Sequence, residues 1–191
     1  MNKNTRQKLI DVTFEEIYSY GYQGASLADI LKKSNVHKGS MYHYFKNKKE
    51  MCLVAIAEKM DERFFEKYGE ILQLQSGFLK ELIKGFKDTS KKDFQRGCPI
   101  ANIVQEMSNI DEDFNQLMKQ VYSKFKGYIK EILDKAIETN EIKKCDSSQL
   151  ALYITVNLER AILATKASGD VKDYSDTILL LEEYLNSLKN K

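Results

Sequence analysis

The fourteen residues from His37 to Glu50, HKGSMYHYFKNKKE, combine four lysines with two histidines, two tyrosines, a serine and a glycine. This mixture can bind a polyanion, because ammonium groups attract phosphates whatever the base sequence, and Ser, Tyr and His donate hydrogen bonds to phosphates or base edges. A buried core would not accept the lysines, and a solvated loop would gain nothing from the aromatic rings. The stretch therefore predicts a surface that faces nucleic acid.

Charge is distributed unevenly along the 191 residues. Residues 1–50 carry nine Lys/Arg against five Asp/Glu, whereas residues 51–191 carry 21 against 23. A basic N-terminal quarter on a slightly acidic remainder is typical of a protein with a polyanionic partner. A merely solvated basic face would give the same count, so charge alone leaves both interpretations open.

Short helices must position this surface. Residues 6–20 show the apolar periodicity of a helix, and Gly21 is expected to end it, because glycine adopts the left-handed conformation at little cost. Ser26 and Asp29 then form a capping box, which opens a short helix that ends near Asn35.

A second short helix is predicted from Lys38 to Phe45, after a tight polar turn. Helices of this length are marginal in water by themselves, so the two must pack on each other through Val36, Met41 and Phe45. With Met41 and Phe45 facing inward, the polar residues of the stretch face outward.

Two short helices joined by a tight turn, the second basic on its outer face, form the helix-turn-helix arrangement that places a helix in the major groove of DNA. Gly39 lets the backbone approach the duplex without an intervening side chain. Lys48 lies at the start of the next helix, where unpaired N–H groups and the ammonium suit a phosphate.

The same residues carry a family resemblance. Residues 5–51 resemble the DNA-binding domain of TetR-family transcriptional repressors. The matching motifs are Gly21-Tyr22 before Ser26, then Leu27-Ala28-Asp29-Ile30, and the string Lys38-Gly39-Ser40-Met41-Tyr42-His43-Tyr44-Phe45 followed by Lys48. The resemblance implies a helix-turn-helix DNA-binding domain at residues 1–47, and a helical domain at residues 48–191 that dimerises and binds a small-molecule inducer.

Contacts with DNA also follow from the resemblance. It implies phosphate contacts from Ser26, Tyr42, Tyr44 and Lys48, and groove contacts from Lys38, Gly39, Ser40 and His43. Position 44 is often histidine in the family and is tyrosine here, so that contact is expected to have an altered geometry. From the residues alone, Tyr42 and Tyr44 could instead pack in the core, and His43 could be exposed without a partner. Residues 21–24 also match the G-x-x-G of an RNA-binding KH loop, but they lack flanking strands, and a helix end explains them better.

Beyond residue 47 the pattern stays helical, which makes the chain all-α, with about nine helices and no convincing strand. Asn47 and Glu50 form a second capping box, which opens a long helix to about Leu74. Further helices are predicted at residues 78–86, 99–108, 111–140, 147–168 and 173–188.

The last two predicted helices are apolar on more than one face, which indicates burial on more than one side. One face can pack in the core and another against a second copy of the chain, and the resemblance implies a four-helix dimer interface here. A homodimer with one recognition helix per subunit would bind a palindromic operator in double-stranded DNA. A purely intramolecular bundle is the alternative.

Aromatic and methionine side chains crowd the middle of the chain. Most belong in a core, but some could line an apolar pocket for a small apolar or electrophilic inducer, with Asn157 and Arg160 as polar anchors. The predicted lining residues are Phe64, Tyr68, Met107, Met118, Tyr122 and Phe125.

Cys98 directly precedes Pro99, and proline is favoured as the first residue of a helix. At such a cap, unpaired N–H groups and the helix dipole stabilise a thiolate, which electrophiles attack. Gly97-Cys98 together with Lys166 resembles TetR regulators that sense reactive electrophiles, which adds Cys98 to the predicted ligand site. A small thiol that only caps the helix is the alternative.

Several classes of function find no support in the sequence. Cys52, Cys98 and Cys145 form no C-x-x-C pair, and two histidines are too few to complete a four-ligand zinc set. No phosphate loop or Ser/Cys–His–Asp set is recognisable, so we expect neither an enzyme nor a bound metal or cofactor. Met1 opens no signal peptide and no 18-residue apolar run follows, so the predicted location is the cytoplasm, without a membrane contact.

The sequence thus predicts a DNA-binding transcriptional regulator, a repressor that leaves its operator when the C-terminal domain takes up an inducer. The competing interpretation is a helical ligand-binding or enzymatic protein whose basic N-terminal segment is incidental.

Overall fold

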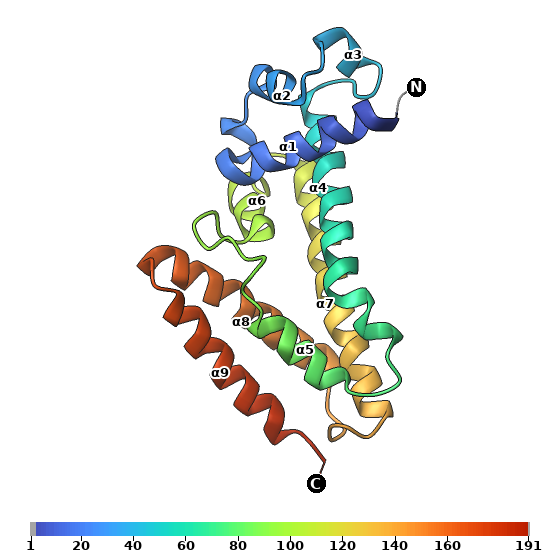
Figure 1. Cartoon of the computed structure of the whole chain (residues 1–191), viewed down its shortest axis with the longest axis vertical. Helices are drawn as coiled ribbons and strands as arrows, with labels where there is room; N and C mark the ends of the chain where they lie inside the picture. Colours follow the sequence, from blue (N-terminus) through green and yellow to red (C-terminus); the bar gives the residue numbers. More distant parts are fainter. Residues whose placement is uncertain (1–2, 191) are drawn as a thin grey trace. The chain divides into compact units, whose positions relative to one another are not determined.

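Helices account for almost all of the regular structure, as expected for a chain with one proline and nine glycines. The computed structural model describes residues 3–190 (Figure 1). One isolated antiparallel bridge, between Ile142 and Lys189, is the only β pairing within that range. The nine α-helices of that range are α1 (Lys3–Gly24), α2 (Leu27–Ser34), α3 (Lys38–Tyr42), α4 (Lys48–Phe64), α5 (Phe78–Lys87), α6 (Pro99–Met107), α7 (Glu112–Glu138), α8 (Ser147–Ser168) and α9 (Val171–Ser187). The predicted all-α class is confirmed.

The chain folds into two compact units, each built from segments that are distant in the sequence. The first unit extends to Glu62 and includes Pro99–Val121, and the second holds Arg63–Cys98 and the residues from Tyr122 onward. Helix α6 and the start of α7 therefore pack with the helix-turn-helix. The predicted division into a DNA-binding domain at residues 1–47 and a ligand-binding domain at residues 48–191 describes function and not packing. It stays a prediction. The signal-peptide prediction starts at Met1, which, like Asn2 and Lys191, lies outside the described residues.

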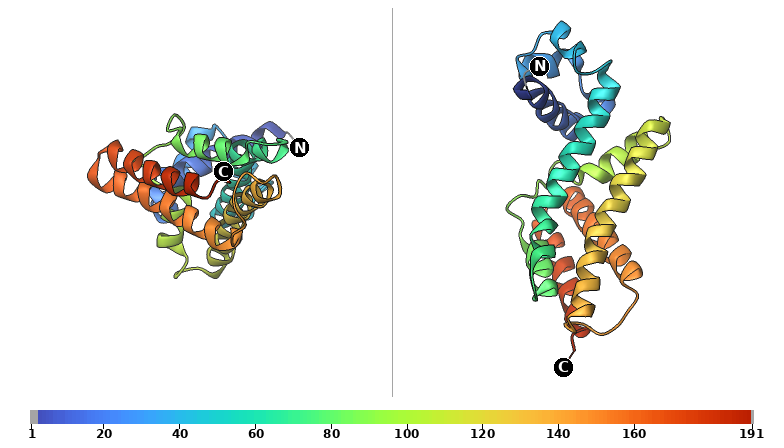
Figure 2. Two further views of the ribbon diagram at one scale, coloured as in Figure 1. Left: turned by 90° about the horizontal axis from the view of Figure 1, so that it is seen from below. Right: turned by 90° about the vertical axis from the view of Figure 1, so that its right-hand side faces the viewer.

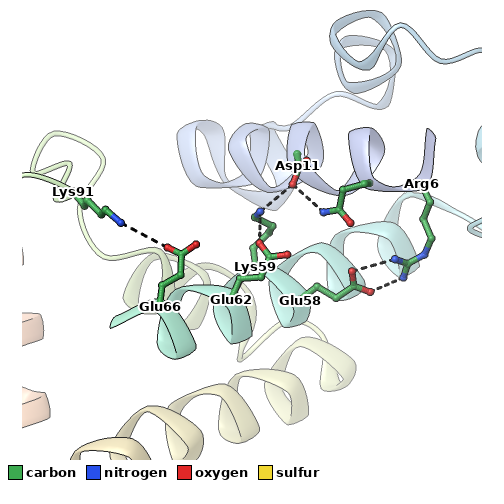
Figure 3. Close-up of polar contacts among 8 residues, drawn as sticks. Arg6, Asp11, Glu58, Lys59, Glu62, Glu66 and Lys91 are labelled. Carbon is green, nitrogen blue, oxygen red and sulfur yellow. Dashed lines mark hydrogen bonds and ion pairs between the residues drawn. The ribbon is translucent and has the colours of Figure 1, made fainter. Parts of the chain in front are cut away.

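Helix α1 organises the first unit, because its apolar side faces the core and its charged side bonds to α4. The Arg6 guanidinium donates to both carboxylate oxygens of Glu58, at 3.1 and 2.5 Å, as Figure 3 shows. At the next residue of α4, the Lys59 ammonium lies 3.0 Å from a carboxylate oxygen of Asp11. Bidentate and paired charges of this kind fix the angle between two helices as well as their contact. The buried side of α1 consists of Leu9, Ile10, Phe14, Ile17 and Tyr18.

Helix α3 is shorter than predicted and ends at Tyr42 instead of Phe45. The N–H groups of Tyr44 and Phe45 both bond to the carbonyl oxygen of Met41, at 2.9 and 3.0 Å. The chain tightens there because Phe45 must turn into the core, where both Met41 and Phe45 are buried as predicted.

The prediction that the long helix extends to Leu74 is also wrong. Helix α4 ends at Phe64, and the chain continues as a π-helical turn, η1 (Phe65–Gly69), and a 3-10 turn, η2 (Ile71–Gln73). Gly69 allows this, because a Cβ atom there would lie 2.8 Å from the Phe65 ring. The wider turn also brings Tyr68 into the interior.

In the second unit, a carboxylate fixes the start of α5. The Glu141 side chain accepts N–H groups from Gly77, Phe78 and Leu79, at 2.5, 3.2 and 3.1 Å. These are the amides that a helix start leaves without an internal partner. None of the helices within residues 3–190 is long and apolar enough to cross a membrane.

Helices α8 and α9 lie side by side in the second unit (Figures 1 and 2). Their inward faces are apolar and buried, with Leu150, Ile154 and Leu158 on α8 and Tyr174, Ile178, Leu181 and Leu185 on α9. Their outward faces are apolar too, although they are exposed: Leu152, Tyr153, Val156 and Leu163 on α8, and Leu179, Leu180 and Tyr184 on α9.

Candidate nucleic-acid interface

The turn between α2 and α3 is fixed by caps at both ends of α2. The Ser26 hydroxyl accepts the Asp29 N–H at 3.5 Å, as the capping box predicts. Asn35 ends the helix in the left-handed conformation, with φ of 52°, and the Val36 N–H bonds to Leu31 O at 3.1 Å. The Lys33 ammonium then holds α2 to α1 through the buried carboxylate of Glu16, at 2.5 Å.

The polar residues of the predicted interface lie together on the outside of α3. Lys38, Gly39 and His43 are exposed, Tyr42 is 51% exposed, and Ser40 and Tyr44 are half-buried. Core packing is therefore excluded for Tyr42. The arrangement presents donors and a positive charge on one face, while Met41 and Phe45 hold the opposite face in the core.

Gly39 is not required by the fold. A Cβ atom built at this position would meet nothing within 4 Å. The open space is consistent with the predicted close approach of an outside backbone, although the contact itself stays a prediction.

Lys48 has an internal role that the sequence did not reveal. Its ammonium donates to the carbonyl oxygen of Tyr22 at 2.6 Å and lies 4.4 Å from the centre of the Tyr22 ring. An ammonium has three donors, so two remain for the predicted phosphate contact.

A second missed residue, Glu106 on α6, holds the end of α1. Its carboxylate accepts the N–H groups of Tyr22 and Gln23 at 2.9 and 2.8 Å. The Tyr22 ring packs on Phe114 of α7, with centroids 4.6 Å apart. Gly21 makes this approach possible, because it takes φ of 74° and ψ of 172° and a Cβ atom there would lie 2.5 Å from the Glu106 carboxylate. The motif Gly21-Tyr22 marked one side of this contact, but nothing in the sequence pointed to Glu106.

The start of α4 is also bonded to the start of α7. The Lys49 ammonium lies 2.7 Å from Asp111 and 2.6 Å from Asp113. The Asn47 side chain accepts the Glu50 N–H at 2.9 Å, which confirms the second predicted cap. The segment that carries the predicted interface is thus held at its end by ion pairs and a cap.

The predicted ligand residues do not all come together. Met107 and Met118 are buried in the first unit, whereas Phe64, Tyr68, Cys98, Tyr122, Phe125, Asn157 and Arg160 belong to the second. Phe64 and Phe125 stack with centroids 5.4 Å apart, and Tyr68 and Tyr128 complete the aromatic cluster. The Asn157 amide donates to Tyr153 O at 2.8 Å, and Arg160 is exposed.

The three thiols have different surroundings. Helix α6 begins at Pro99, so the half-buried Cys98 directly precedes it. Two residues before Cys98, the carbonyl oxygen of Arg96 accepts a hydrogen bond from the Lys166 ammonium at 3.0 Å. Burial raises the pKa of Cys52 to about 12, an effect that Lys48 partly offsets. The pKa of Cys145 is raised by burial and by the carboxylates of Asp146 and Asp134. Both of these thiols are therefore poor nucleophiles at neutral pH.

Two family models match the chain. Residues 9–55 match "Bacterial regulatory proteins, tetR family", and residues 78–179 match "Tetracyclin repressor-like, C-terminal domain". The first match covers the helix-turn-helix and the second covers α5 to most of α9.

Whole-chain comparisons agree with these matches. An HTH-type transcriptional regulator in the lacX 3′ region of Lactococcus lactis is 35% identical, over 99% of this chain and 97% of its own. The Escherichia coli HTH-type transcriptional repressor NemR is 27% identical, over 85% of this chain and 88% of its own. Among solved structures, the reduced form of E. coli NemR superposes with a TM-score of 0.85 at 19% identity, over 97% of both chains. A TetR-family regulator from Cytophaga hutchinsonii gives 0.86 at 21% identity, over 100% of this chain and 98% of its own. At these identities the solved structures establish the fold.

A cap-fixed helix-turn-helix with a basic, exposed α3 defines a DNA-binding transcriptional regulator. The chain belongs to the tetR family of bacterial regulatory proteins.

Replacing Gly21 with alanine is expected to destabilise the protein by about 1–3 kcal/mol, because φ of 74° with ψ of 172° is open essentially to glycine alone. The added Cβ atom would also push against the Glu106 carboxylate. The urea midpoint of the full chain measures the effect. Gly127→Ala is the control, because that glycine lies inside α7 with nothing within 4 Å of a Cβ atom, and alanine there should leave stability unchanged or raise it. Equal midpoints for Gly21→Ala and the wild type would contradict the role given to Gly21.

Proposed function

We propose that the chain is a dimeric repressor that binds its operator through α2 and α3 and leaves it when the second unit takes up an inducer. The observation that carries the proposal is the outward face of α3, where charged and hydrogen-bonding side chains are exposed on a helix that Met41 and Phe45 hold from behind. Such a face has no structural use in the free protein. It suits the floor of a major groove.

The proposed contacts divide by chemistry. Ser26, Tyr42, Tyr44 and Lys48 are placed against phosphates, where they set orientation, and Lys38, Gly39, Ser40 and His43 enter the groove, where they read sequence. The exposure of Tyr42 and the open space at Gly39 support this division. The spare donors of Lys48 suit a phosphate next to the start of α4.

The proposed dimer forms through the outward faces of α8 and α9. A contiguous set of exposed leucines, valine and tyrosines is unusual on a monomer and marks an interaction surface. The edge-to-face pair of Tyr153 and Tyr184, with centroids 5.4 Å apart, joins the two helices within this surface. A two-fold pairing of this surface would present two α3 helices to the two halves of a palindromic operator.

Repression and release are proposed from the relatives and from Cys98. E. coli NemR is described as a repressor, and it matches most of this chain. A thiol directly before α6 could receive an electrophilic inducer, and Glu106 near the other end of that helix bonds to the end of α1. The proposed function is regulation and not catalysis. The proposed location is the cytoplasm, where a one-component regulator can bind DNA.

The test of the function is a gel-shift titration with DNA from upstream of the gene itself. A repressor should bind one palindromic site at nanomolar concentration and lose it with rising salt. Binding that is weak and equal for unrelated DNA would favour the competing interpretation, a helical ligand-binding protein with an incidental basic segment.

Tyr42→Phe keeps the ring and removes the hydroxyl, so it should weaken operator binding by about 1 kcal/mol, or about fivefold, without changing the urea midpoint. Tyr20→Phe serves as the control, because Tyr20 is also exposed but lies on α1. Unchanged affinity in the Tyr42 variant would remove its hydroxyl from the proposed phosphate contacts.

Leu180→Glu should split the dimer and abolish tight operator binding, because the carboxylate would be buried without a partner at the interface. Leu180 is 67% exposed in the single chain, so the fold itself should tolerate the change. Ile110→Glu is a matched control, since Ile110 is 65% exposed and belongs to the first unit, not to α8 or α9. Sedimentation velocity reads the outcome, and a Leu180→Glu protein that stays dimeric would place the interface elsewhere.

Brief treatment with substoichiometric N-ethylmaleimide should label Cys98 first, since the pKa values of Cys52 and Cys145 are both raised. Mass spectrometry of tryptic peptides gives the order directly. Cys98→Ser should bind the operator normally but resist release by the same reagent. Release of the serine variant by the maleimide at the wild-type rate would mean that another residue or a reversibly bound ligand controls the domain.

A further inference from the structure

The π-helical turn η1 presents two neighbouring polar groups that form no hydrogen bond or ion pair within residues 3–190. Tyr68 is only 2% exposed, and its hydroxyl has no hydrogen-bond partner anywhere in residues 3–190. The Lys67 ammonium lies 5.3 Å from the centre of the Tyr68 ring. Single π-helical turns inside α-helices occur frequently at functional sites.

A buried hydroxyl without a partner destabilises a protein, and phenylalanine would fill the same space without that cost. The Tyr68 ring already packs against Phe125 and Tyr128, with centroid distances of 6.1 and 6.0 Å. Packing therefore explains the ring but not the hydroxyl. A ligand that accepts a hydrogen bond would explain it.

The surroundings of Lys67 and Tyr68 are positively charged. Lys92 lies close enough to repel Lys67, and it donates to the carbonyl oxygens of Phe86 and Asp88. The Asp88 carboxylate faces the same region, although it accepts the Ser90 N–H at 2.9 Å. Cys98 interacts electrostatically with both Lys67 and Tyr68. Lys67 is exposed, although protein atoms lie around its ammonium.

We propose that Lys67 and Tyr68 form the polar end of the effector site, where the ammonium and the hydroxyl both donate to the carboxylate of a small organic acid. The proposal rests on the proposed function, in which the second unit takes up an effector, and it names the chemical class of that effector. The aromatic cluster of Phe64, Phe125 and Tyr128 around Tyr68 suits an acid with an apolar body. Cys98 interacts electrostatically with the same two groups, so an acid that is also an electrophile could react with this thiol.

The charge on Lys67 gives the site a pH dependence. Burial, and then repulsion from Lys92, lower the pKa of Lys67 to about 8, while Cys98 and Asp88 act in the opposite sense. The free ammonium is thus lost as the pH rises through about 8. A bound carboxylate favours the charged form, so carboxylate affinity should fall over the same pH range.

Calorimetry with the full-length protein tests the site, using acetate, benzoate and 3-phenylpropanoate as probes and their uncharged amides as partners. The wild type should bind at least one acid about tenfold or more tightly than its amide. Tyr68→Phe should lose about tenfold in that affinity while its urea midpoint stays equal or rises, because the hydroxyl has no partner to lose. Lys67→Met should lose at least as much, and Lys67→Arg should retain binding but lose the decline above pH 8.

Lys80→Met is the matched control, because Lys80 is an exposed lysine of α5 and the change in net charge is the same. If no acid binds more tightly than its amide, or if the Tyr68 and Lys67 variants bind like the Lys80 variant, the carboxylate site is wrong. Operator binding in the gel shift stays an independent measurement. Loss of operator binding with an intact carboxylate site would overturn the proposed function instead.

Discussion

The carboxylate of Glu106 accepts two backbone N–H groups where α1 ends, and the placement of the helix-turn-helix depends on that pair of bonds. A charged acceptor contributes more than a neutral one, about 1.5–3 kcal/mol per bond. Glycine is the only residue type that permits this approach at position 21. Tyr22 in turn accepts a hydrogen bond from Lys48 and packs on Phe114. Because the carbonyl oxygen of Tyr22 holds Lys48, the start of α4 is coupled to α6 by two hydrogen bonds in series.

In the function proposed above, this coupling gives α6 a place in regulation. Its first residue, Pro99, follows Cys98, and Glu106 lies next to its last residue. In the proposed release by an electrophile, the modified thiol would directly precede the short helix that holds the end of α1. Glu141 fixes the start of α5 by the same kind of contact, which shows that single glutamates set helix positions in both units.

Two departures from ideal packing in the second unit are consistent with binding. The outward faces of α8 and α9 expose apolar side chains that water solvates poorly, and Tyr68 buries a hydroxyl that no group within residues 3–190 satisfies. Natural sequences depart from local packing rules mainly where a partner or ligand completes them. In our proposals, a second apolar surface covers the outward faces of α8 and α9, and a hydrogen-bond acceptor binds Tyr68 and Lys67.

Local signals in the sequence were enough for the helix class, the caps at Ser26 and Asn47, the start of α6 at Pro99 and the exposed polar face of α3, because each depends on residues within one or two turns. The sequence also indicated that α9 is apolar on two sides. Only the tertiary structure decided that Ile178 and Leu181 pack within the chain while Leu179 and Leu180 face out. It also decided the π-helical turn that buries Tyr68, the packing of α6 with the helix-turn-helix, and the bonds of Glu106 and Lys48 to Tyr22. These contacts join residues far apart in the chain, and their formation depends on the shape of the whole core, which no local pattern records.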